Sequence, residues 1–163
     1  MFNAHALTDS TAAVPPHHDH QAPDANELRA LATPLADMLA AHSGLSVQLA
    51  VPHARGARIV HHVFRPDNTL QQLETGRIRP AGSALAAALG TRRARCVYTV
   101  EEDQPDTASL ATSLTDAEPR PWPVALALVG PRDALHPGTE AGRRRRTMLC
   151  ETADALADAL TGG

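Results

Sequence analysis

The chain has 163 residues, a formal net charge of −3 at pH 7 and 43% hydrophobic residues, but only 2% aromatic residues. A single domain of this length buries a core, which we expect to consist of alanine, valine and leucine. All 15 basic residues are arginine, which excludes a P-loop lysine, a Schiff-base lysine and a Ser-Lys dyad. The negative net charge argues against general nucleic-acid binding.

The first 23 residues are polar, contain prolines and show no hydrophobic period, so we predict a disordered tail at 1–23 before a domain at 24–163. This tail has no export pattern, and no apolar run reaches the ~20 residues of a membrane helix. We therefore expect a cytoplasmic protein in which Cys96 and Cys150 are free thiols. Residues 17–20 (HHDH) contain side chains that can bind a metal ion. A flexible tract does not hold such ligands in place, so we favour a tract without function over one that captures metal weakly.

The segment from Asp24 to His42 predicts an amphipathic helix. Asp24 and Glu27 have the spacing of a capping box, and Gly44 suits the left-handed residue that follows a helix. Pro34 either kinks this helix or starts a second one. The apolar stripe contains Leu28, Leu31, Leu35, Met38 and Leu39.

Three strands are predicted next. Residues 46–51 alternate between apolar and small or polar side chains, and 59–64 are apolar on both faces, as in a central strand. A third, short strand is predicted over 69–74. In residues 77–90, Pro80 predicts the start of a small-residue helix, which either receives a ligand at its first turn or simply packs on the sheet.

The second half of the chain predicts two more strands and a long helix. Residues 96–100 and 122–131 have strand character, whereas 101–121 are acidic and weakly periodic, so we expect a long surface loop there, with solvation favoured over a catalytic carboxylate. The last helix starts at Thr139 or Glu140. Its four arginines at 143–146 are expected to overhang the sheet edge near carboxylates, with a nucleic-acid patch as the alternative.

In this order, residues 28–90 and 122–160 resemble the effector-binding domain of IclR-type bacterial transcription regulators, a GAF-like fold. LATPLADMLAAHSGLSVQLAV looks like the family's helix and first strand, RIVHHVFR like the second strand, RPAGSALAAALG like the small-residue helix, and VALALVGP like the last strand. The resemblance implies an α+β fold with an antiparallel sheet of about five strands and the N- and C-terminal helices on one side. The family's winged helix-turn-helix finds no counterpart in the tail, so we expect no DNA binding by this chain alone.

The resemblance places an effector against the start of the small-residue helix and the last strand. Where family members often carry hydroxyls, this strand has alanine and valine, so we expect a ligand more apolar than a small keto acid. Independently of the resemblance, the positive charge of Arg79 makes it a candidate partner for an anionic ligand. The predicted ligand-binding residues are Arg79, Pro80, Ala81, Gly82, Ser83, Ala127 and Val129.

We therefore expect a non-enzymatic, small-molecule-sensing regulatory domain without cofactor or metal. Its effector is a small organic compound, with carboxylates and aromatic compounds among the candidates. The ligand would bias the packing of a homodimer, or of a heterodimer with related regulators, through the apolar stripe of residues 149–160. The alternative is a ligand-free dimerisation module with a degenerate pocket. Catalysis is disfavoured because no spacing predicts a catalytic geometry for His53, His61 or His62 with Ser83 or Cys96.

Overall fold

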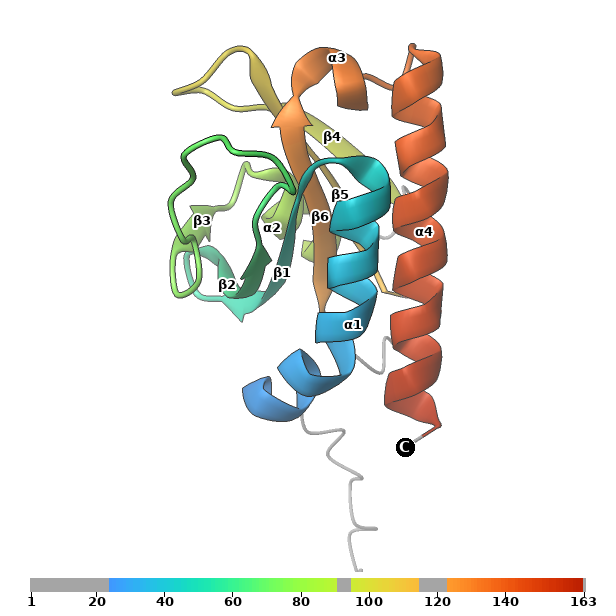
Figure 1. Cartoon of the computed structure of the whole chain (residues 1–163). Helices are drawn as coiled ribbons and strands as arrows, with labels where there is room; N and C mark the ends of the chain where they lie inside the picture. Colours follow the sequence, from blue (N-terminus) through green and yellow to red (C-terminus); the bar gives the residue numbers. More distant parts are fainter. Residues whose placement is uncertain (1–23, 91–94, 115–122, 163) are drawn as a thin grey trace, which may run out of the picture.

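The computed structural model describes residues 24–90, 95–114 and 123–162 and has the predicted α+β architecture. A curled antiparallel sheet has six strands rather than about five, in the order β3-β2-β1-β6-β5-β4 (Figure 1). The elements are α1 (Ala25–Ser43), β1 (Ser46–His53), β2 (Gly56–Val63), β3 (Ile78–Pro80), α2 (Ala84–Gly90), β4 (Cys96–Val100), β5 (Thr107–Ser113), β6 (Ala125–Pro131), α3 (Arg132–Leu135) and α4 (Glu140–Thr161).

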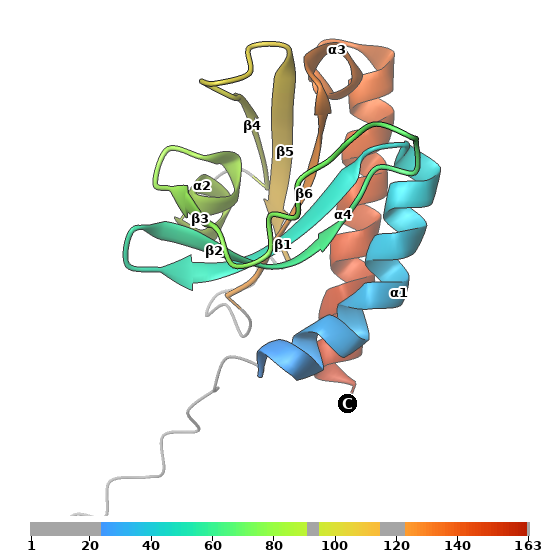
Figure 2. The same ribbon diagram turned by 60° about the vertical axis from the view of Figure 1, so that its left-hand side comes forward.

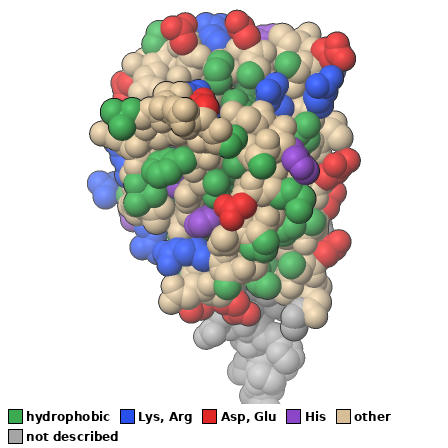
Figure 3. All heavy atoms as spheres, in the orientation of Figure 1, with side chains coloured by type: hydrophobic (Ala, Val, Ile, Leu, Met, Phe, Trp, Pro, Cys, Tyr) green, Lys and Arg blue, Asp and Glu red, His purple; other side chains and the backbone are tan. Residues whose placement is uncertain are grey.

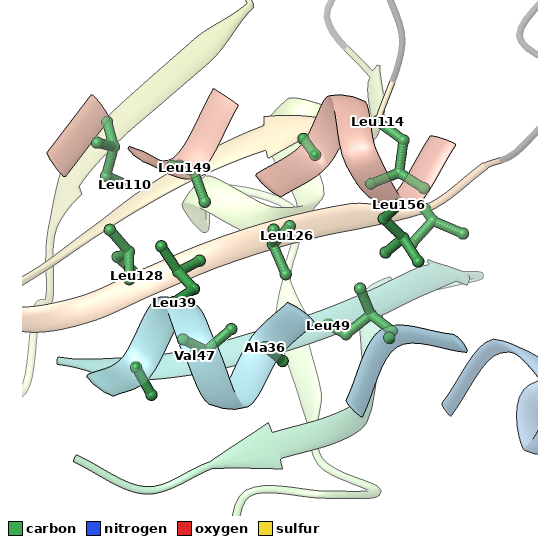
Figure 4. Packing of buried hydrophobic residues seen from close by; sticks show 14 of the residues in the cluster. Ala36, Leu39, Val47, Leu49, Leu110, Leu114, Leu126, Leu128, Leu149 and Leu156 are labelled. Atoms are coloured by element: carbon green, nitrogen blue, oxygen red, sulfur yellow. The ribbon is translucent and has the colours of Figure 1, made fainter. Parts of the chain in front are cut away.

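The two terminal helices pack side by side on one face of the sheet, as predicted (Figures 1 and 2). Between these helices and the sheet lies a core of leucine and valine from every layer. Figure 4 shows side chains from α1, α4 and the strands pointing toward one another. We call this side of the sheet the leucine face; its fully buried members include Leu28, Val47, Leu49, Leu126, Leu128, Leu149 and Leu156.

Helix α1 begins after Asp24 and ends where Gly44 adopts the left-handed conformation with φ 72°, both as predicted. The prediction of a capping box is wrong, because the side chain of Asp24 makes no capping hydrogen bond. Pro34 lies inside the helix, which bends along its length in Figure 2. A proline removes one backbone hydrogen bond and crowds the preceding turn, which accounts for the bend.

Helix α4 begins as predicted, with the Thr139 hydroxyl accepting a hydrogen bond from the backbone N–H of Gly142 at 3.0 Å. The predicted overhang is wrong: α3 packs against the start of α4, and Gly142 is buried there. The predicted carboxylates are not the main partners either. Arg145 donates instead to the backbone carbonyl of Ser43 at the end of α1, at 3.0 Å, and to that of Ala134 in α3, at 3.4 Å.

The opposite side of the sheet, which we call the alanine face, is covered by the short helix α2 (Figure 2). Small side chains there let α2 approach the strands closely. The buried residues of this layer are Ala50, Ala57, Ile59, Ala84, Leu85, Ala88, Ala111, Ala125 and Ala127. The alternation predicted for the last strand is confirmed, because Leu126 and Leu128 lie on the leucine face and Ala125 and Ala127 on the alanine face.

Strand β2 is apolar on both faces and contains a bulge. The register with β1 shifts between Leu49 and Ala50, so that Val60 has no partner on β1. Ile59 packs on the alanine face and Val60 on the leucine face. The Val60 carbonyl accepts a hydrogen bond from Nε of Arg29 at 2.7 Å, so helix α1 satisfies the bulged backbone.

The third strand was predicted at the wrong place. Residues 69–74 form a loop, with Leu70 98% exposed and Leu73 63% exposed, and β3 is Ile78–Pro80 instead. The Gln71 side chain organises this loop by accepting from the backbone N–H of Arg65 at 2.7 Å. Strand β3 approaches Gly56 so closely that an added Cβ there would lie 2.1 Å from the carbonyl oxygen of Arg79. Only glycine permits this pairing.

Two further expectations need correction. Pro80 ends β3 rather than starting a helix, and α2 begins at Ala84 after the Ser83 hydroxyl has accepted from the N–H of Ala86 at 3.4 Å. The predicted surface loop at 101–121 contains the buried strand β5. Its sequence TASLATS is too weakly hydrophobic to show a strand period, although β4 and β6 pair with both of its edges.

The predicted tail at 1–23, with the HHDH tract, lies outside the described residues. Among the helices that are described, none combines the length and apolar character required to cross a bilayer.

Candidate functional site

A polar cleft opens on the part of the alanine face that α2 leaves uncovered. It lies between the loop that follows β2 and the turn that joins β4 to β5, seen at the left and top of Figure 1. Two adjoining cavities of about 530 and 300 Å³ form it. Both are lined by Gln48, Gln72, Glu74, Gln104, Thr107 and Val129.

The strand register explains how the floor of the cleft arises. Gln48 lies between His62 of β2 and Ala127 of β6, and Ser46 pairs with Val129 one step along the strands. Helix α2 seals Ala127 completely but stops short of Val129, which is part of the cavity wall. The same sheet face is therefore a packed core at one end and a cleft floor at the other.

Gln48 is the most unusual residue of this floor. Its side chain is 7% exposed and lines both cavities. Within the described part of the chain, no residue forms a hydrogen bond with its side-chain amide. The amide is open to the cleft and is not among the buried polar atoms without a partner in the described structure. It therefore presents a donor and an acceptor, free of protein partners, to water or to a ligand in the cleft.

The three arginines that border the cleft are each paired with a carboxylate. Arg65 contacts Asp67 at 3.1 Å, and Arg77 contacts Glu74 at 2.8 Å. Arg79 forms an ion pair with Glu101, whose other oxygen accepts from the Ser109 hydroxyl at 2.7 Å. These pairs neutralise the positive charge at the rim of the cleft.

His62 fixes one wall of the cleft. Its Nδ1 accepts a hydrogen bond from the backbone N–H of Glu74 at 3.0 Å, and its ring makes an edge contact with Phe64 at 5.0 Å. Burial lowers the pKa of His62, against the raising effect of the Glu74 carboxylate. The neutral ring is the form that accepts this bond, so His62 holds the loop backbone at neutral pH.

The structure brings only part of the predicted ligand-binding set to the cleft. Arg79 and Val129 line it, whereas Ala127 is sealed beneath α2. Pro80, Ala81 and Gly82 are exposed, and neither they nor Ser83 belong to the lining of the two cavities. The assignment of the helix start to the ligand depended on Pro80 being helical, which it is not.

Sequence reasoning missed Gln48, His62, Gln72, Gln104 and Thr107. One signal was present: Gln48 interrupts the apolar run VQLAV, and a polar residue there belongs to the sheet face opposite Val47 and Leu49. The lining is also more polar than predicted, because amides and hydroxyls come from loops rather than from the last strand.

The residues considered for catalysis do not converge. His61 and His62 are consecutive residues of β2, and His61 interacts with Asp37 and Arg29 of α1 on the leucine face. Cys96 lies on β4, at the other end of the strand order. Over the described ranges 24–90, 95–114 and 123–162, no group of three or more His, Cys, Asp or Glu side chains is arranged to hold a metal ion.

Sequence comparison finds two related regulators and no matching family model. The chain is 53% identical over 60 residues to the glycerol operon regulatory protein of Streptomyces coelicolor and 50% identical over 60 residues to that of Streptomyces griseus. The matched stretch is 37% of this chain and 24% of either regulator. The chain thus spans about a quarter of these relatives' length.

Comparison with solved structures extends over most of the chain. An IclR homologue from Microbacterium hydrocarbonoxydans, complexed with 4-hydroxybenzoate, superimposes with a TM-score of 0.70 at 15% identity, covering 86% of this chain and 70% of that one. An IclR-family regulator from Brucella abortus gives 0.68 at 17% identity, covering 82% and 63%. Transcriptional regulator YaiJ gives 0.70 at 15% identity, covering 83% of this chain and 96% of that one. The resemblance seen in the sequence is confirmed: this chain has the fold of IclR-type effector-binding domains.

Proposed function

We propose that this chain is a regulatory domain that senses a small, uncharged, polyhydroxylated molecule in the cleft around Gln48. The observation that carries the proposal is the Gln48 amide, which faces the cavity without a protein partner in the described structure. A ligand hydroxyl can both donate to and accept from this amide, in place of water.

The charges around the cleft favour a neutral ligand over an anion. Arg65, Arg77 and Arg79 are already paired with carboxylates, so a ligand carboxylate would have to displace one of them. The lining further contains Asp103 and Asp106, which repel an anion. The 4-hydroxybenzoate in the Microbacterium structure indicates that this fold accommodates small organic ligands, and the names of the Streptomyces relatives point to glycerol or a related polyol.

The response would travel through the elements that frame the cleft. A ligand that bonds Gln48 and the loop around Glu74 favours one packing of the sheet against α1 and α4. The stripe of residues 149–160, which was expected to form a dimer face, is buried in the leucine face of the single chain and is therefore not available for a dimer. The outer sides of these helices carry other exposed apolar surface, including Met38 at 56% exposure, which would form the interface of a dimer. Ligand binding would then change the dimer equilibrium.

Thermal unfolding against a ligand panel tests this function. The panel contains glycerol, longer sugar alcohols and 4-hydroxybenzoate, with mass in solution measured alongside. At 100 times its dissociation constant a specific ligand adds about 2.7 kcal/mol, which raises the midpoint by roughly 5–10 °C in a domain of this size. Polyols also stabilise proteins by exclusion from the surface, so a variant without the site is required as reference.

Gln48→Met is that reference, because it keeps the length of the side chain and removes both hydrogen-bonding groups. We expect its affinity for the polyol to fall at least tenfold, while Thr152→Val on α4, far from the cleft, responds like the original chain. Equal shifts in all three proteins would show exclusion alone and contradict the proposal. A stable dimer that responds to no ligand would support the interaction module instead.

A further inference from the structure

The only two cysteines of the chain meet on the leucine face, far from each other in sequence. Sγ of Cys96 on β4 lies 3.3 Å from Sγ of Cys150 on α4, and both side chains are half-buried. Disulfide sulfurs are about 2.05 Å apart, so the pair needs an approach of little more than an ångström to bond. Strand β4 is at the end of the strand order and pairs with β5 alone, so the approach of Cys96 to Cys150 disturbs the pairing of one strand only.

The surroundings of the pair distinguish the two thiols. A hydrogen bond from Cys150 is the largest cause that lowers the pKa of Cys96, to about 6, and the Arg146 guanidinium adds to it. The hydrogen bond with Cys96 and burial raise the pKa of Cys150. Cys96 therefore holds the thiolate at neutral pH, and Cys150 holds the proton.

Both thiols are partly exposed, and Cys150 opens directly to the surface. Cys150 lines a surface groove of about 410 Å³ along α4, together with Arg143, Arg146, Thr147, Glu151 and Asp154. Arg95 fixes the two elements in register, because it forms an ion pair with Asp154 and donates to the backbone carbonyl of Cys150 at 3.4 Å. Figure 3, in the orientation of Figure 1, shows both basic and acidic side chains along the edge of the molecule that α4 forms.

We propose that Cys96 and Cys150 form a dithiol modification site that hydrogen peroxide oxidises to an intramolecular disulfide. The Cys96 thiolate attacks one peroxide oxygen, the O–O bond breaks and hydroxide leaves, giving a sulfenic acid. The Cys150 sulfur then attacks the Cys96 sulfur; the S–S bond forms, the S–O bond breaks, and the hydroxyl leaves as water with the proton of Cys150. Two thiols lose two electrons, and the peroxide is reduced to two waters.

Oxidation would join the edge strand of the sheet to the C-terminal helix. These are the two elements that Arg95 already holds together, so the bond forms without a change of fold. The site is on the face opposite the cleft, and it is independent of the ligand proposed above.

Peptide mapping of the whole chain tests the proposal. The reduced protein is exposed to stoichiometric hydrogen peroxide at pH 7, alkylated and digested with trypsin. We expect a linked pair of peptides, 96–132 and 147–163, whose mass is about 2 Da below the sum of the free peptides. Recovery of both thiols unmodified, sulfinic acid at Cys96 without a linked peptide, or a disulfide between two chains would each overturn the proposal.

Two sets of variants assign the roles of the two thiols. In Cys150→Ser, oxidation should stop at a sulfenic acid on Cys96 that dimedone traps, and in Cys96→Ser, Cys150 should remain a thiol. Iodoacetamide alkylation of Cys96 should reach half of its maximal rate near pH 6. Arg146→Gln should move that midpoint upward, whereas Arg144→Gln, whose guanidinium is beside Glu140, should leave it unchanged. A midpoint above pH 8 in the original chain would contradict the assignment of Cys96 as the attacking thiol.

Discussion

The two faces of the sheet differ in side-chain size and in how completely they are covered. The leucine face is sealed by α1 and α4, of 19 and 22 residues, whereas the alanine face is covered only by the seven residues of α2. Large side chains on one face provide most of the buried apolar area. Small side chains on the other admit a short helix and leave the rest of the face open to a ligand. Stability and binding are thus separated onto opposite sides of one sheet.

The largest effect is expected on the leucine face. Leu126→Ala removes a side chain that is 1% exposed and leaves a cavity between the sheet and both long helices. We expect a loss of about 3 kcal/mol in the free energy of unfolding, measured by urea denaturation. Leu70→Ala, at 98% exposure, is the control and should change stability by less than about 0.5 kcal/mol. Similar losses in both would remove the distinction between core and surface.

On the alanine face, enlarging a side chain should be harmful. Ala127→Leu inserts three carbons beneath α2, where the residue is fully buried. We expect destabilisation of about 1–3 kcal/mol from overpacking. An unchanged stability together with lost ligand binding would instead place Ala127 in the ligand wall, as the family resemblance implies.

Two buried polar residues sharpen the contrast between a packed position and a binding position. Thr112 is fully buried and donates to the backbone carbonyl of Arg95 at 2.7 Å, so Thr112→Val should cost about 1–1.5 kcal/mol. Gln48→Met should change stability by less than about 0.5 kcal/mol, because the amide it removes has no protein partner and is open to the cleft. Chemical denaturation of the unliganded variants measures both. A clear destabilisation by Gln48→Met would show a structural role for the amide.

The smallest effect concerns pH. Burial lowers the pKa of His62 and of His61 below the ordinary value of 6.5. The unfolded chain therefore binds protons first as pH falls, so stability should be complete above about pH 6.5 and decline below it, through the lowered folded pKa values. Denaturation midpoints between pH 7.5 and 5 measure this decline, and His62→Gln should reduce it. An increase in stability toward pH 5 would contradict the assigned direction.

Periodic segments were predictable from the sequence, whereas contacts made by backbone and small residues were not. The stripe of Leu28 and Leu39 and the alternation around Leu126 identified α1 and β6, because one buried face imposes a period on the chain. Strand β5 was not predicted, because most of its buried side chains are threonine, serine and alanine, which give no hydrophobic period. Strand β3 depends on the missing side chain of Gly56, which no hydrophobic pattern reveals.

The site was less predictable than the fold. Arg79 and Val129 line the cleft and their role toward a ligand stays a prediction, whereas Gln48 becomes notable only when the length of α2 is known. Likewise, the meeting of Cys96 and Cys150 depends on how α4 crosses the sheet, and residues 54 positions apart carry no spacing signal for it.

The central pairing of β1 with β6 has a consequence for how the chain folds. It divides the sheet into halves that are each nearly continuous in sequence, β3-β2-β1 from the first part of the chain and β6-β5-β4 from the second. Within each half, neighbouring strands follow one another along the chain, whereas joining the halves requires residues about 80 positions apart to meet. The leucines of α1 and α4 lie over this junction and have no complete partner until it closes. Folding should therefore be limited by the docking of two preformed hairpin units, and a leucine at the junction should slow folding when it is truncated, whereas an alanine under α2 should mainly change the rate of unfolding.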